Sequence, residues 1–168
     1  MKKAVMISIR PKWVELIAAK KKTVEVRKTR PKIETPFKCY IYETKGKIEL
    51  QRGEECVYIY QEGRCAVIGE FVCDAIYEIK NVGNAFKVGK TEAETNIVAR
   101  ASCIDFTDMH DYLGHKGGYG WHISDLLIYD EPLWLSQMTA EKRGRGFYIR
   151  GPITRPPQSW CYVEEVKD

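Results

Sequence analysis

The chain has 168 residues, enough to bury a hydrophobic core without disulfides or a structural metal, and this length predicts a single domain over residues 1–168. Its 27 Lys and Arg against 23 Asp and Glu give a formal net charge of +4, which permits a polyanionic partner without requiring one. The apolar runs are too short for a membrane span or a signal peptide, so we expect neither a membrane protein nor a secreted one.

The first part of the chain predicts short strands around one helix. Residues 4–9 form an apolar run typical of a strand buried on both faces. A helix is predicted over residues 11–19, because it begins with proline and its apolar residues recur at intervals of three and four. Strands are then expected over residues 23–27 and Phe37–Glu43.

The middle of the chain continues the β pattern. Residues 45–53 are polar and rich in turn residues, which predicts a hairpin or an insertion before a strand at residues 56–60. The longest β pattern runs over residues 65–79. Gly69 and Asp74 inside it predict a bulge or a bend.

Two helices are expected next. One is predicted around residues 92–100, in a polar connector with few aromatic residues. The other covers residues 106–113, with Asp105 or Thr107 as its N-cap and Gly114 at its end.

The last third predicts two strands and a basic loop. Three glycines let the backbone turn sharply before a strand within residues 117–130. Residues 139–157, rich in Arg, Gly and Pro, are interpreted as a mobile loop around a short strand at residues 147–149. A final strand is expected within residues 158–166. The elements together predict a mixed α+β, mainly β fold, a small β-barrel with two or three short helices.

The six cysteines are scattered, with no Cys-x-x-Cys pair, and most lie among β-branched or aromatic residues. This distribution predicts buried, reduced thiols rather than a disulfide framework or a zinc site. We therefore expect a cytoplasmic protein with no metal and no other cofactor. The predicted core comprises Ile7, Ile9, Leu16, Ile17, Val24, Val26, Ile41, Val67, Phe71, Ile123 and Val163.

A row of polar side chains is expected along the strand at residues 23–27. Because side chains alternate between the faces of a strand, burying its two valines places Thr23, Glu25 and Arg27 on the opposite face, with Lys22 at the start of the strand. The alternative is a solvated edge strand, on which an exposed ion pair contributes only about 0 to 1 kcal/mol. Similarly, His122 is either a histidine satisfied by one hydrogen bond or a member of a site.

The segment MISIRPKWVELIAAKKKTVEVRK resembles the opening of an ASCH domain of the PUA-like superfamily, of the small bacterial or phage-encoded type. Lys22, Thr23, Glu25 and Arg27 match the motif G-K-K-T-x-E-x-R of that family, and GYGWHISDLLIYDEP and RPPQSWCYVEEV resemble its later strands. The resemblance implies a PUA-like β-barrel with a charged cleft where the helix meets the strand.

The resemblance also implies an RNA or a nucleotide-like ligand. The expected ligand-binding residues are Ser8, Arg10, Lys22, Thr23, Glu25, Arg27, Tyr42, Trp121 and His122. The alternative is a small hydrolase acting on a modified nucleoside, like the acetylcytidine amidohydrolases, or a ribonuclease, with Lys22, Thr23 and Glu25 as catalytic residues. A hydroxyl against Lys22 with a further acid nearby would favour the enzyme, whereas charge and aromatic rings alone would favour binding.

Overall fold

The structure is a computed structural model that describes residues 2–46, 48–52, 55–59, 63–83, 85–143 and 148–166, without the side chains of 48–52, 55–59, 142, 143 and 148. The chain is mixed α+β and mainly strand, as predicted. It divides into two compact units: the first unit contains Met1–Glu15, Cys39–Glu70 and Leu127–Asp168, and the second unit contains Leu16–Lys38 and Phe71–Leu126. No helix in the described part of the chain is long and apolar enough to cross a membrane.

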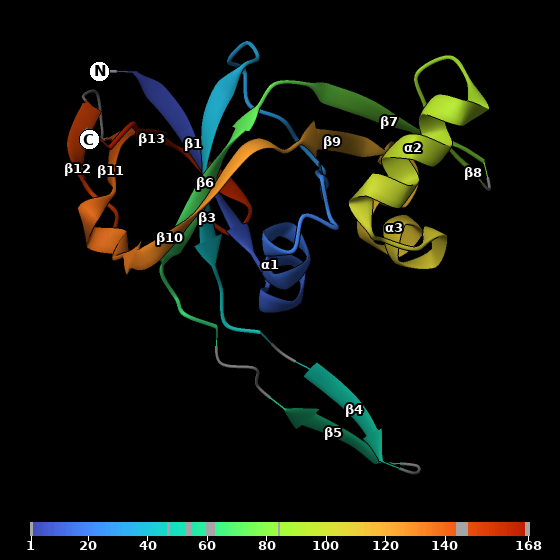
Figure 1. The fold of residues 1–168 in the computed structure, drawn as a ribbon, viewed down its shortest axis with the longest axis horizontal. Coiled ribbons are helices and arrows are strands. Elements are labelled where there is room, and N and C mark those ends of the chain that lie inside the picture. Colours follow the sequence, from blue (N-terminus) through green and yellow to red (C-terminus); the bar gives the residue numbers. More distant parts are fainter. Residues whose placement is uncertain are drawn as a thin grey trace. The chain divides into compact units, whose positions relative to one another are not determined.

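The elements follow one another as shown in Figure 1. In chain order they are β1 (Lys3–Ile9), α1 (Pro11–Ala18), β2 (Val24–Arg27), β3 (Phe37–Glu43), β4 (Ile48–Arg52), β5 (Glu55–Ile59), β6 (Val67–Cys73), β7 (Ile76–Val82), β8 (Ala85–Val88), α2 (Glu92–Ser102), α3 (Phe106–Leu113), the 3-10 helix η1 (Gly114–Lys116), β9 (Gly118–His122), β10 (Ser124–Leu133), the 3-10 helix η2 (Leu135–Gln137), β11 (Thr139–Arg143), β12 (Tyr148–Pro152) and β13 (Trp160–Glu164).

The apolar strand β1 lies inside a five-stranded sheet of order β10-β6-β3-β1-β13. It is parallel to β3 and antiparallel to β13, so Val5 lies opposite both Cys39 and Tyr162. Every residue from Ala4 to Ile9 is buried, which confirms the prediction of a strand covered on both faces. The core of the first unit includes Ala4, Met6, Tyr40, Tyr42, Val67, Met138, Ala140, Ile153 and Val163.

The second unit is built on a four-stranded sheet of order β2-β9-β7-β8. One face of this sheet packs against α2 and α3, which lie beside β7 and β8 in Figure 1. Both valines of β2 are on this face and are buried, as the alternation predicted. The core of the second unit comprises Val24, Val26, Ile79, Val88, Val98, Met109 and Leu113.

The helices α2 and α3 each begin at a capping residue, and the cap of α3 was predicted. Asp105 caps α3, its side chain accepting a hydrogen bond of 2.8 Å from the Asp108 backbone N–H, and Gly114 ends the helix in a positive-φ conformation. Thr91 and Glu94 form a reciprocal capping box at the start of α2.

Four β segments differ from the predictions. The long β pattern is two strands, β6 and β7, separated at Asp74 and Ala75. The segment after the three glycines is likewise divided at Ile123 into β9 and β10. The basic loop contains a hairpin, in which β11 pairs with β12, and β8 is an additional strand of four residues, too short for a clear period. Phe147, predicted to start a strand here, lies outside the described residues.

The predicted core residues are all buried except Leu16, which is half-buried. Among the cysteines whose side chains are described, Cys39 and Cys73 are buried thiols, and the other three are half-buried thiols rather than fully buried ones. Burial also raises the pKa of the Cys73 thiol to about 12.

Candidate functional site

The helix α1 leads directly into the polar part of β2. The backbone of Lys20 adopts φ 56°, the left-handed conformation that commonly ends a helix. The backbone N–H groups of Lys21 and Lys22 both donate to the carbonyl oxygen of Leu16, at 2.9 and 3.0 Å. This turn ends the helix and directs Lys22 inward.

Lys22, Glu25 and Arg27 form a buried ionic cluster. Glu25 Oε2 lies 3.3 Å from Lys22 Nζ, and Glu25 Oε1 lies 2.9 Å from Arg27 Nη2. Lys22 Nζ also donates a 2.5 Å hydrogen bond to the carbonyl oxygen of Ser102 at the end of α2. The three ionic side chains are 0%, 7% and 8% exposed, so the cluster is shielded from solvent.

This burial corrects two of the expectations for β2. The strand is not a solvated edge strand, because all four of its residues are buried. The resemblance also implied a charged cleft at this place, whereas Lys22 has no exposed side-chain surface. The physical reason is that the C-terminal end of α2 lies against the start of β2. There the Ser102 carbonyl accepts the hydrogen bond that Lys22 would otherwise donate to water.

The ionic cluster contains two cations and one carboxylate. Glu25 bridges the two cations and partly offsets the cost of removing them from water, leaving a formal charge of +1 for the three side chains. Such a charge in a poorly hydrated place attracts anions more strongly than the same charge on the surface does.

Thr23 and Ser102, the hydroxyl-bearing residues near the cluster, make contacts within the fold. Thr23 is half-buried; its backbone N–H donates to Ala101 O, and its carbonyl accepts from Ile123 N, both at 2.9 Å. The Ser102 hydroxyl donates to Ala99 O at 2.7 Å. These contacts tie β2 to α2 and to the start of β10.

Trp121 and His122 are neighbours on β9 with different surroundings. Trp121 is fully buried and its ring meets Phe37 edge-on, with 6.0 Å between centroids, so it packs in the core rather than on an open ligand face. His122 Nδ1 lies 2.6 Å from Asp74 Oδ1, and this hydrogen bond lowers the pKa of the Asp74 carboxyl. This contact fits the interpretation of His122 as a histidine satisfied by one hydrogen bond.

Ser8, Arg10 and Tyr42 belong to the first unit. The Ser8 hydroxyl donates to Pro157 O at 2.6 Å. Arg10 is exposed, and its backbone carbonyl accepts from the first turn of α1. Tyr42 is buried in the core of that unit, and this burial raises the pKa of its hydroxyl.

The sequence reasoning missed a group of exposed cations and aromatic rings just after β2. Lys28 Nζ lies 5.2 Å from the centre of the Tyr112 ring, and the Arg30 guanidinium lies 5.8 Å from the centre of the Tyr119 ring. Tyr119 on β9 lies directly opposite Arg27 on β2, so this group is next to the ionic cluster. We call Lys28, Arg30, Tyr112 and Tyr119 the basic–aromatic surface. The sequence feature that could have indicated this surface is the pair Lys28 and Arg30, which follows the motif ending at Arg27.

In the part of the chain that the structure describes, no three His, Cys, Asp or Glu side chains are grouped so that they could hold a metal ion. Together the fold and this site define a small α+β domain with a buried ionic cluster beside a basic, aromatic surface.

Comparison with known proteins finds solved structures with a similar fold. No family model and no curated protein matches the chain. The crystal structure of ASCH from Zymomonas mobilis has a TM-score of 0.60 and 20% identity, over 96% of this chain and 88% of that chain. Variants of that protein with one tyrosine changed to phenylalanine or one serine to alanine have TM-scores of 0.61 and 0.60 at 19% identity, covering 98% and 96% of this chain and 92% and 89% of theirs. The chain has the fold of an ASCH domain, as its opening motif indicated.

Proposed function

We propose that the chain binds single-stranded RNA or a nucleotide-like ligand at the basic–aromatic surface of its second unit. The observation that carries this proposal is the pairing of exposed cations with aromatic rings beside Arg27. Single-stranded nucleic acid is bound by this combination, since rings stack on bases while Lys and Arg contact phosphates.

The ionic cluster supports this surface in two ways. Glu25 fixes the Arg27 guanidinium at 2.9 Å, and the pairing of β2 with β9 positions Lys28, the residue directly after β2. The excess positive charge of the cluster adds to the field that Lys28 and Arg30 present to a phosphate. The β-barrel and the cytoplasmic location remain parts of this proposal.

The test is the fluorescence anisotropy of a short labelled oligouridylate at several salt concentrations. Lys28→Ala and Arg30→Ala should each weaken binding and flatten the plot of log affinity against log salt by about 0.7 to 1 unit per lost phosphate contact. Lys90→Ala removes an exposed lysine of the same unit outside this surface and is the matched control. Tyr112→Ala should cost about 1 to 3 kcal/mol of binding, and Tyr112→Phe should retain it, because stacking needs only the ring.

Three results would decide against this function. The first is an affinity that does not fall as salt rises, and the second is equal binding by Lys28→Ala and Lys90→Ala. The third is turnover of acetylcytidine or cleavage of the RNA that is lost in Glu25→Gln, which would support the hydrolase alternative, because loss of a general base typically slows a reaction about a hundred- to ten-thousandfold.

A further inference from the structure

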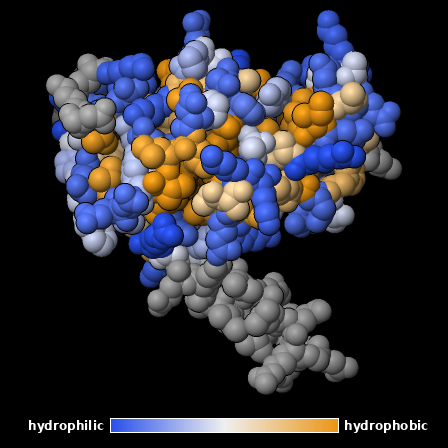
Figure 2. Space-filling view, viewed as in Figure 1, coloured by the Kyte–Doolittle hydropathy of each residue, from blue (hydrophilic) through white to orange (hydrophobic). Residues whose placement is uncertain are grey.

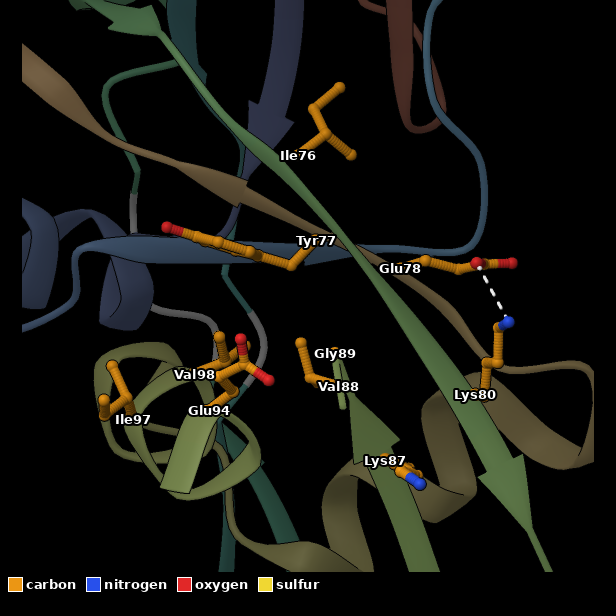
Figure 3. Close-up of a pocket in the computed structure, with 10 residues that line it drawn as sticks. All are labelled: Ile76, Tyr77, Glu78, Lys80, Lys87, Val88, Gly89, Glu94, Ile97 and Val98. Atoms are coloured by element: carbon orange, nitrogen blue, oxygen red, sulfur yellow. Dashed lines mark ion pairs between the residues drawn. The ribbon is translucent and has the colours of Figure 1, made fainter. Parts of the chain in front are cut away.

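The second unit has a pocket of about 490 Å³ beside β7, the end of β8 and the first turns of α2 (Figure 3). No member of the ionic cluster or of the basic–aromatic surface lines it. Figure 2 shows apolar surface next to charged surface over α2, at the right of the view. The residues that line the pocket are Ile76, Tyr77, Glu78, Lys80, Lys87, Val88, Gly89, Glu94, Ile97 and Val98.

The pocket lies at an open edge of the sheet. Along β7, residues Ile76–Ile79 pair with β9, but only Ile79–Val82 pair with β8 on the other side. At the end of β8, Thr95 Oγ1 bonds to both the N–H and the carbonyl oxygen of Val88, at 3.0 and 3.2 Å. The chain then turns at Gly89, with φ 65°. Among the described strands, none lies beside Ile76–Glu78 on this side.

The hydrogen-bond pattern between β7 and β9 indicates which backbone groups of β7 face this edge. In an antiparallel pair, the N–H and C=O of one residue point to the same neighbouring strand, and those of the next residue point away. His122 N donates to Ala75 O, so Ala75 and Tyr77 direct their groups at β9. Ile76 and Glu78 therefore direct theirs at the open edge, where an added strand could bond to them.

The two faces beside this edge have different chemistry. Figure 3 shows Tyr77 pointing to the side where Ile97 and Val98 lie, and the Glu78–Lys80 ion pair on the other side of β7. Ile97 is 67% exposed, a large apolar side chain that a partner could cover.

The polar face carries an excess of positive charge. Lys80 lies directly opposite Lys87 on β8, and like charges in this position repel. Glu78 offsets one of them at 3.4 Å, while Lys87 forms no ion pair within the described residues. The Glu94 carboxylate is occupied at the start of α2, where it accepts from Lys90 N, Thr91 N and Thr91 Oγ1, and these bonds lower its pKa.

We propose that the edge of β7 at Ile76–Glu78 binds an extended peptide segment with alternating apolar and acidic residues, which adds to the sheet as a strand. Its apolar side chains cover Tyr77, Ile97 and Val98, and its carboxylates lie over Lys80 and Lys87. A second copy of this chain is the less favourable occupant, because the edge it presents has the same excess of positive charge.

The probe is a labelled six-residue peptide of alternating valine and glutamate with both ends blocked, titrated by fluorescence anisotropy. Lys87→Glu and Ile97→Asp should each weaken binding at least tenfold. Lys116→Glu and Val82→Ser, which change an exposed lysine and an exposed valine outside the pocket, should leave the affinity within about twofold. A peptide with lysine in place of glutamate should bind at least tenfold more weakly.

Amide hydrogen exchange separates strand addition from looser binding. The peptide should slow exchange at the N–H groups of Ile76 and Glu78, and it should leave Tyr77 unchanged, because that group already faces β9. The proposal is overturned by no saturable binding, by a backbone N-methylated peptide that binds as well as the parent, or by a concentration-dependent dimer whose formation protects the same two amides.

Discussion

Glu25→Gln tests the ionic cluster most directly, because the substitution keeps the size of the side chain and removes its charge. With an effective dielectric constant of about 20, the attractions across 3.3 and 2.9 Å amount to about 5 and about 6 kcal/mol. Desolvation of the three groups offsets much of this sum, and breaking a buried pair by removing one partner typically costs about 3 to 5 kcal/mol. We expect a loss of that size, since two buried cations would then face each other.

The assay is equilibrium unfolding in urea, followed by circular dichroism, with Glu78→Gln as the matched control. Glu78 lies in the sheet of the same unit and pairs with Lys80 at 3.4 Å, but its side chain is 61% exposed. The control should therefore cost no more than about 1 kcal/mol. Lys22→Met should cost less than Glu25→Gln because it leaves the bond between Glu25 and Arg27 in place. Equal losses for Glu25→Gln and Glu78→Gln would refute the argument from burial.

Two further predictions concern the same unit. Gly118→Ala would place a Cβ 2.6 Å from the backbone oxygen of Arg27, so unfolding experiments should show a loss of about 1 to 3 kcal/mol, whereas Gly151→Ala, with open space around it, should stay within about 0.5. A similar loss in both variants would contradict this. The hydrogen bond from His122 lowers the pKa of Asp74, so its stabilisation is present above the unfolded value of about 3.9 and is lost as pH falls through the lower native value. Asp74→Asn should flatten the decline of stability with acid over that range; an unchanged acid profile would rule out this linkage.

Local signals explain most of what the sequence predicted correctly. The apolar run of β1 and the capped helix α3 can each be recognised within a window of about ten residues, because the pattern and the caps depend only on neighbours along the chain. The hairpin of β11 and β12 has no such pattern, because Ala140 is buried in the core while Glu141, Ile149 and Arg150 are exposed. Its pairing was therefore not predicted.

The face on which Glu25 and Arg27 lie also followed from alternation, but its burial did not. The alternation of side chains along a strand shows which of them share a face, but it does not show what covers that face. Here the answer depends on Ser102, whose carbonyl meets Lys22 across 80 positions of sequence. Nothing in the residues around Lys22 indicates that contact, so the burial of these charges was not predicted.

The same contact has a consequence for biosynthesis. Because a ribosome adds residues from the N-terminus, the segment from Lys22 to Arg27 emerges long before α2 exists, and 80 residues separate the ammonium from its carbonyl acceptor. Until then the three charges remain hydrated, since burying them without that acceptor is unfavourable. β2 therefore completes its packing late, after residue 102 has left the exit tunnel, and nascent chains that stop before α2 should remain open to proteases at this strand.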